Sequence, residues 1–175
     1  MNRRQFLGFA LSSAVTPALA KKQNNEPRFL SLHHLHTDEK IKVTYRIGDR
    51  YQRSALHDLN HFLRDFRTDD VAVMDPKLFD FLYDIKHRLG DPDGVFEIVS
   101  AYRCPKTNAM LRKTSRRVAK RSLHMNGQAL DIRISNMRTR SVRDSALELR
   151  RGGVGYYPKS DFVHIDTGTV RRWGA

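Results

Sequence analysis

Hydrophobic and polar residues alternate over residues 29–36 and again over 41–47, on either side of the polar segment Thr37-Asp38-Glu39. Such alternation around a polar turn predicts a β hairpin. Apolar residues then recur at helical spacing from Leu56 to Phe66, and again from Leu78 to Leu89 after Pro76. Two amphipathic helices are therefore expected to follow the hairpin.

The second half of the chain mixes short strands with helices. The turn Asp91-Pro92-Asp93-Gly94 precedes a β-rich run, Val95 to Tyr102, that predicts a central strand. A basic, partly helical stretch follows. Mixed elements without regular βαβ alternation indicate an α+β fold. The remaining expected elements are strands at 129–134, 154–157 and 162–166, and a helix over 139–151 that ends at Gly152-Gly153.

The first twenty residues predict an export signal instead of a folded element. Arg3-Arg4 precedes a short apolar run, and Ala18-Leu19-Ala20 forms a small-residue cleavage site. The run is shorter than the roughly 20 apolar residues that a membrane span requires. Adjacent arginines favour the twin-arginine route over the general secretory route, and hence a periplasmic protein. We expect a signal peptide at 1–20, a flexible leader at 21–28 and a single domain at 29–175.

The composition restricts the partners and the chemistry of any metal site. The chain has 175 residues, a formal net charge of +13 and one cysteine, Cys104. One cysteine excludes an internal disulfide framework and a thiolate cluster, so a metal would need His and carboxylate ligands. For an exported basic protein the expected polyanion is the cell wall rather than nucleic acid. The basic residues of 106–121 form either a solvated loop or a rim that faces this polymer.

Histidine and aspartate residues are spaced so that they can meet in the predicted sheet. Alternation in 129–134 places Asp131 on the face opposite Leu130 and Ile132, and alternation in 162–166 separates His164 from Val163 in the same way. If these two strands pair, Asp131 and His164 face a common cavity, and His124 from the preceding loop completes a three-residue set. Such a set leaves the fourth tetrahedral position of a catalytic zinc for water. The alternative is that the buried His and Asp residues only satisfy one another.

The pattern Ser122-x-His124-x-x-Gly127-x-Ala129-x-Asp131 with a late His164 resembles the LAS zinc peptidases, which include D-Ala-D-Ala carboxypeptidases and VanX-type dipeptidases. The fuller sequence is most similar to murein endopeptidases of the MepK type; shared segments include 59–65, 152–158 and 162–168. The resemblance implies a small antiparallel sheet flanked by helices, and one Zn²⁺ per chain held by His124, Asp131 and His164. It also implies hydrolysis of peptide cross-links in peptidoglycan. Carboxypeptidase or dipeptidase activity, or non-hydrolytic peptidoglycan binding with a structural zinc, are the alternatives.

Relatives also suggest roles for residues around the ligands. They commonly place the general base three residues before the last ligand, where this chain has Asp161, but strand parity favours Asp166 unless the chain bends near Ser160. Asp166 could instead orient a ligand. Arg103 is expected to stabilise the oxyanion and bind substrate, or else to pair with an aspartate. Ser122 is expected to bind substrate, with helix capping as the alternative.

Other candidate residues fit metal or thiol chemistry less well. His57 and His61 have zincin spacing, but Asp58 stands where that motif requires Glu. His33 alternates away from His34 and His36, and Cys104 is expected to be a spectator thiol. No stable membrane span and no surplus apolar face are apparent, so a monomer is expected.

Overall fold

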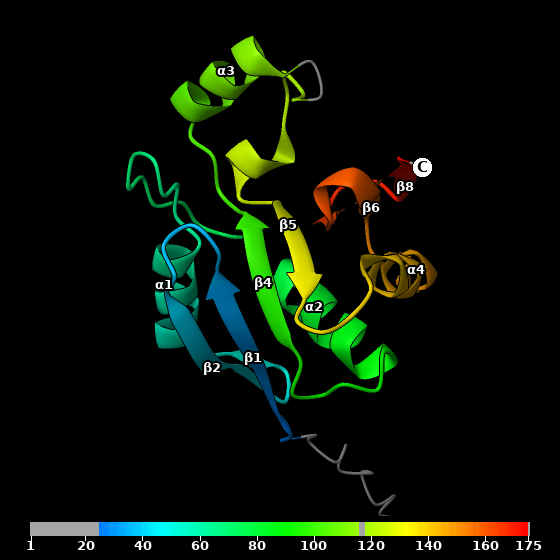
Figure 1. Cartoon of the computed structure of the whole chain (residues 1–175). Helices are drawn as coiled ribbons and strands as arrows, with labels where there is room; N and C mark the ends of the chain where they lie inside the picture. Colours follow the sequence, from blue (N-terminus) through cyan, green and yellow to red (C-terminus); the bar gives the residue numbers. More distant parts are fainter. Residues whose placement is uncertain (1–24, 116–117, 175) are drawn as a thin grey trace, which may run out of the picture.

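A computed structural model describes residues 25–115 and 118–174; the predicted signal peptide and the first part of the predicted leader lie outside the described residues. Eight strands form one sheet in the order β3-β2-β1-β4-β5-β7-β6-β8, accompanied by four α-helices (Figure 1). The predicted α+β class is confirmed. The strands are β1 (Pro27–His34), β2 (Lys40–Ile47), β3 (Arg50–Tyr51), β4 (Val95–Ser100), β5 (Ala129–Ile134), β6 (Gly153–Tyr157), β7 (Phe162–Asp166) and β8 (Arg171–Trp173). The helices are α1 (Arg53–Phe62), α2 (Lys77–Arg88), α3 (Pro105–Thr114) and α4 (Thr139–Leu149), with the 3₁₀ turns η1 (Leu123–Asn126) and η2 (Pro158–Ser160).

The sheet is larger than the small antiparallel sheet that was expected, and it is mixed. β1 pairs with β4 in parallel, and β6 pairs with β8 in parallel, while the other pairs are antiparallel. The β1/β4 pair is parallel because a long connection through β2, β3, α1 and α2 returns the chain to the same end of the sheet. Neither β3 nor β8 was predicted, since two or three residues are too few to show a period.

The core lies on one face of the sheet. Helix α1 packs against β2, α2 against β1, and α4 against β5, β6 and β7 (Figure 1). Burying a large aliphatic or aromatic side chain here stabilises the fold by about 1.5 to 3 kcal/mol. The strand residues on this face include eight that are at most 1% exposed: Leu30, Leu32, Phe96, Ile98, Leu130, Ile132, Val163 and Ile165.

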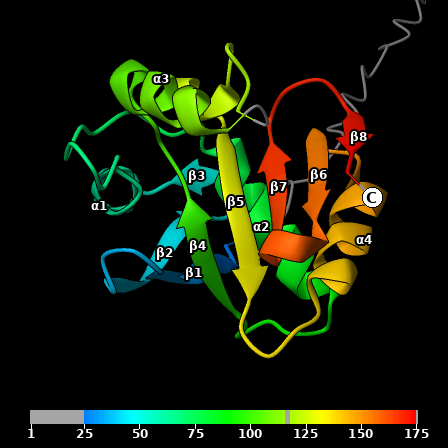
Figure 2. The same cartoon turned by 45° about the horizontal axis from the view of Figure 1, so that its top comes forward.

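The opposite face of the sheet is polar and only partly covered. Ser31, His33, Glu97 and Arg133 lie on it half-buried, and Arg133 forms an ion pair with its cross-strand partner Glu97. Helix α3 and the turn η1 sit beyond the ends of β4 and β5 (Figure 2). The two-residue period therefore separates a helix-covered apolar face from a face available for polar chemistry.

The other predicted elements agree with the structure in position. The hairpin β1–β2, the helices α1 and α2 and the strand β5 are confirmed. Helix α4, however, ends at Leu149, and Arg150 rather than a glycine adopts the left-handed conformation at its end, with φ 50°. Within the described ranges, none of the helices combines the length and apolar character needed to cross a membrane.

Candidate metal centre

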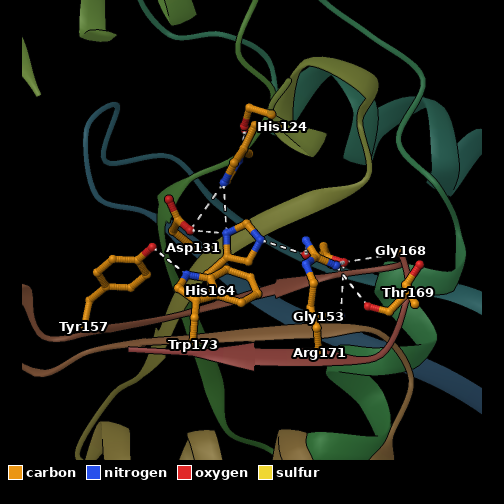
Figure 3. A network of polar contacts seen from close by, with 12 residues as sticks. His124, Asp131, Gly153, Tyr157, His164, Gly168, Thr169, Arg171 and Trp173 are labelled. Carbon is orange, nitrogen blue, oxygen red and sulfur yellow. Dashed lines mark hydrogen bonds and ion pairs between the residues drawn. The ribbon is translucent and has the colours of Figure 1, made fainter. Parts of the chain in front are cut away.

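Three donor atoms meet where β5, β7 and η1 come together. Asp131 on β5 and His164 on β7 are direct cross-strand partners, as the parity of their strands predicts. Nδ1 of His164 lies 2.8 Å from Oδ1 of Asp131, and Nε2 of His124 lies 3.2 Å from that Nδ1 and 3.3 Å from that Oδ1 (Figure 3). The predicted His, Asp and His residues are therefore brought together in one triangle.

This triangle fits a metal ion. Ligand atoms about 2.0 to 2.2 Å from a tetrahedral metal lie roughly 3.3 to 3.6 Å from one another, close to two of the three separations. His124 and Asp131 are 1% and 9% exposed, so the donors are held in place and shielded. In the part of the chain that the structure describes, these three residues are the one group with suitable metal donors. Three protein donors leave a position for a substrate or water.

Hydrogen bonds fix which nitrogen of each histidine faces the triangle. Nδ1 of His124 donates to the carbonyl oxygen of Ala101 at 2.7 Å, which leaves the lone pair of Nε2 free. Nε2 of His164 donates to Oδ2 of Asp166 at 3.1 Å, which leaves the lone pair of Nδ1 free. Carbonyl and carboxylate partners of this kind orient metal-binding histidines.

Asp166 is itself held by a dense set of donors. The backbone N–H groups of Gly153 and Gly168 donate to its Oδ1 at 3.0 and 2.9 Å. Arg171 donates to both carboxylate oxygens, at 3.1 and 2.7 Å. Burial opposes ionisation of Asp166, but the hydrogen bonds from His164, Arg171 and the two backbone amides outweigh it and lower its pKa to about 2. Asp166 is therefore an ionised, fully engaged carboxylate behind His164.

The electrostatics of the triangle suit metal binding. Burial works against the Asp131 carboxylate, but the two histidines hold its pKa well below the ordinary value. Burial lowers the pKa of His124, so this ring is neutral. Burial also acts to lower the pKa of His164, but Asp131 and Asp166 outweigh it and raise that pKa. The raised pKa of His164 means that this ring tends to bind a second proton, on the nitrogen that faces Asp131. A cation at the triangle would take the place of that proton.

A cavity of about 510 Å³ opens beside the triangle. Arg103, Arg121 and Arg171 line it, and among the described residues Asp131 is the only carboxylate that does. Nη2 of Arg103 donates to Oγ of Ser122 at 3.1 Å, while its Nε is buried and has no hydrogen-bond partner among the described residues. Within the described chain, Arg103 forms no ion pair with Asp131 or Asp166, so the alternative role as their partner is not observed. The cavity therefore presents positive charge to a ligand.

Ser122 lies at this cavity and immediately precedes η1. Its side chain makes no capping hydrogen bond to η1, so the capping alternative is not observed. Its hydroxyl oxygen instead accepts the hydrogen bond from Arg103. The hydroxyl thus positions the guanidinium at the wall of the cavity.

Asp161 and Asp166 occupy different surroundings, and neither lines the cavity. The chain does bend at η2, and Asp161 is left-handed with φ 51°, so strand parity does not govern its direction. Its carboxylate accepts hydrogen bonds from Thr139 Oγ1 at 3.0 Å and Arg133 Nη1 at 3.4 Å. Its neighbours Ser160 and Phe162 do line the cavity, which puts Asp161 at the rim.

The remaining candidates lie away from the triangle. His57 and His61 are exposed on α1, and His57 lies near Asp58, its neighbour in sequence. His34 is buried against Phe62 and Phe66, with its pKa lowered to about 4 mainly by burial. Cys104 is buried, and its sulfur accepts a hydrogen bond from the backbone of Thr107.

Arg171, Trp173 and Tyr157 line the cavity but are not among the site residues that the sequence predicts. Arg171 holds Asp166, and the ring of Trp173 lies 5.1 Å from that of His164, between centroids. Tyr157 accepts a hydrogen bond from the indole N–H of Trp173 at 2.8 Å. Tyr157 stands in the segment 152–158 that carries the resemblance, but Arg171 and Trp173 belong to a strand too short to be predicted.

Comparisons with known proteins establish the family of this chain. Residues 22–173 match the sequence family described as peptidoglycan L,D-endopeptidase MepK. Proteins with that name from Escherichia coli K12 and Shigella flexneri are 46% identical to this chain over 177 residues, covering 98% of the chain and 97% of each relative. A Haemophilus influenzae protein named "probable peptidoglycan L,D-endopeptidase MepK" is 40% identical, over 98% of the chain and 95% of its own length. With the match spanning nearly all of the described fold, this chain belongs to the MepK family of peptidases.

Proposed function

We propose that this protein is a zinc-dependent endopeptidase that hydrolyses peptide cross-links in peptidoglycan. The observation that carries the proposal is the triangle of His124, Asp131 and His164 at the wall of a positively charged cavity. The names of the relatives specify an L,D-endopeptidase, and we extend this specificity to the present chain. The bond would then join an L centre to a D centre between two stem peptides.

Such a substrate places the protein outside the cytoplasm. The predicted signal peptide at 1–20, with Arg3-Arg4, supports export to the periplasm by the twin-arginine route. Free carboxylates of the stem peptides would be attracted by the net positive charge of the chain.

Zinc is the metal that this donor set favours. Two imidazole nitrogens and one carboxylate oxygen match a catalytic zinc site with three protein ligands. When bound, zinc supplies a nucleophilic water near neutral pH and polarises the scissile carbonyl. His124, Asp131 and His164 would hold the ion, while Ala101 and Asp166 fix the two imidazoles in the tautomers that binding requires.

Arg103 is proposed to stabilise the negative charge that develops on the carbonyl oxygen. Its guanidinium is anchored at one end by Ser122, and its Nε–H has no other partner in the described chain. A preorganised donor of this type typically lowers the barrier by about 3 to 4 kcal/mol. Ser122 is proposed to contribute to substrate binding by holding the Arg103 guanidinium at the cavity wall.

Asp161 is proposed as the proton acceptor, and Asp166 as a positioning residue. The donors around Asp166 leave it little capacity to accept another proton, and its pKa of about 2 makes it a weak base. Asp161 is exposed at the rim of the cavity, where a proton can be taken up and released. Catalytic hydrogen bonds often form only in the substrate complex, which is consistent with its present contacts to Thr139 and Arg133.

The proposal is tested by incubating purified, cross-linked muropeptide dimers with the mature protein, with and without a chelator, and identifying the products by mass spectrometry. We expect dimers to become monomers, the conversion to stop with the chelator, and Zn²⁺ to restore it. The product masses identify the bond. Release of only a terminal D-Ala would replace the proposal by carboxypeptidase activity, and intact dimers with a zinc-loaded protein would favour a non-hydrolytic binding protein.

A further inference from the structure

A second cavity adjoins the metal centre and has no role in the chemistry above. Its volume is about 460 Å³, within the range of roughly 300 to 1,000 Å³ that is common for ligand pockets. Tyr157, Ser160 and Trp173 line both cavities, so the two share a wall. The other residues of this second cavity are Tyr156, Pro158, Lys159 and Gly174.

The shared wall is built from aromatic side chains that are fixed relative to a metal ligand. The indole N–H of Trp173 donates to the hydroxyl oxygen of Tyr157 at 2.8 Å, and the Trp173 ring lies against His164 (Figure 3). The Tyr157 ring stacks on Phe162 with centroids 4.5 Å apart, and the guanidinium of Arg171 lies 5.0 Å from the Trp173 ring centroid. The wall therefore has a defined place beside the site of reaction.

Gly155 allows the indole to lie there. Gly155 on β6 pairs with His164 on one side and with Trp173 on the other. A Cβ at position 155 would lie 2.7 Å from Cζ2 and Nε1 of the indole, which is too close for real atoms. Strand register and the absence of a side chain at Gly155 thus set the position of Trp173.

We propose that this second cavity is a substrate subsite that binds one arm of the peptide cross-link, an acidic peptide, while the other arm lies in the cavity at the metal centre. This inference rests on the proposed function. An endopeptidase must accommodate residues on both sides of the scissile bond, and the two cavities adjoin one another at Tyr157, Ser160 and Trp173. Lys159 is exposed and is the one charged residue among those lining the second cavity, so the cavity favours an arm that carries a carboxylate.

The kinetic test compares three soluble substrates: a cross-linked stem-peptide dimer, and two truncated forms that keep the scissile bond but each lose the outer residues of one arm. We expect Lys159→Glu to raise KM for the dimer roughly fivefold with little change in kcat, because charge reversal repels the arm. For the truncated form that lacks the arm bound in the second cavity, we expect Lys159→Glu to leave KM unchanged. Lys40→Glu, the same change at an exposed position at the start of β2, is the matched control and should leave KM unaltered.

A binding test uses the intrinsic fluorescence of the shared wall. Trp173 is the only tryptophan of the chain, so the emission reports this wall. The zinc-loaded protein is titrated with each of the two released arms in turn. We expect a saturable change in the Trp173 emission, and we expect Lys159→Glu to weaken the affinity for one of the two arms roughly fivefold.

Three results would overturn the subsite. These are an equal KM for the dimer and both truncated forms in the wild type, an equal effect of Lys159→Glu on all three substrates, and no fluorescence change that Lys159→Glu alters. A wild-type protein that hydrolyses none of the substrates would contradict the proposed function instead, and the fluorescence titration would still decide whether the cavity binds the peptide arm.

Discussion

At the scale of single residues, two carboxylates close to His164 in sequence have opposite surroundings. Asp166 is fully buried, and its oxygens accept hydrogen bonds from two backbone amides, Arg171 and His164. Asp161 is exposed, and its carboxylate accepts hydrogen bonds from the side chains of Thr139 and Arg133. A buried, saturated carboxylate suits the orientation of a ligand, while an exposed one can exchange protons with solvent.

The variants Asp166→Asn and Asp161→Asn should therefore fail in different ways. Asp166→Asn should weaken zinc binding roughly 10- to 100-fold, since the amide cannot replace the carboxylate that orients His164. Asp161→Asn should keep its zinc affinity and lower kcat roughly 100-fold or more, the usual contribution of a general base. Competition with a chromophoric chelator measures the affinity, and circular dichroism checks the fold. An Asp161→Asn enzyme with the wild-type kcat would rule out Asp161 as the base.

At the scale of elements, the turn between η1 and β5 determines where His124 lies. Gly127 is left-handed there with φ 66°, and its carbonyl oxygen accepts a hydrogen bond from the N–H of Asp75 at 2.8 Å. A Cβ at this position would overlap the backbone carbonyl of Val73. The segment before α2 thus packs directly on the turn that carries a metal ligand.

Replacing Gly127 by Ala tests this packing, and Gly90→Ala is a matched control. Gly90 has a similar φ of 71°, but a Cβ there would have no atom within 4 Å. We expect Gly90→Ala to cost about 1 kcal/mol of unfolding free energy, from backbone strain alone. Gly127→Ala should cost about 2 to 4 kcal/mol and also weaken zinc binding, because the backbone must move. Urea unfolding and chelator competition measure the two effects; equal losses in both variants would contradict the packing.

At the scale of the whole molecule, a second polar cluster lies in the other half of the sheet. Asp80 on α2 accepts hydrogen bonds from Tyr45 and Arg46 of β2 and Tyr51 of β3, and forms an ion pair with Arg28 of β1. Its side chain is 8% exposed. Burial opposes its ionisation, but the hydrogen bonds from Tyr51, Tyr45 and Arg46 outweigh burial and lower its pKa. One carboxylate therefore joins three strands to a helix.

Stability should depend on pH through Asp80. Because its pKa is lower in the folded state than the ordinary value of 3.8, its contribution is complete above that value and is lost as pH falls through the folded pKa. Asp80→Asn should cost about 2 to 4 kcal/mol at pH 7, since it removes the charge that pairs with Arg46 and replaces one of the two acceptor oxygens by an amide donor. The difference from wild type should shrink below pH 3.8 in urea unfolding.

Asp84→Asn on the same helix provides the control for Asp80. Asp84 pairs with Arg151 near the surface, and loss of such a pair should change stability by less than about 1 kcal/mol at any pH. A pH-independent difference between wild type and Asp80→Asn would refute the role of Asp80.

The α+β class, the order of the longer elements and the meeting of Asp131 with His164 are predictable from the amino-acid sequence. Each of these follows from a local rule: side chains alternate along a strand, so residues 131 and 164 could be assigned to the polar face before their partners were known. The motif that contains His124 and Asp131, together with the late His164, then related this arrangement to a peptidase family. The placement of His124 near them was inferred from the same motif.

The groups that support and enclose the site depend on long-range packing and cannot be predicted from local sequence patterns. Strand β8, the contact of Arg171 with Asp166, and the wall of Trp173 and Tyr157 depend on the parallel pairing of β6 with β8, which no local period reveals. The surroundings of Asp161 and Asp166 likewise depend on residues distant in sequence, such as Thr139 and Gly153. Hydrophobic periodicity specifies which face a side chain occupies, but the groups that meet it there are set by the packing of the whole chain.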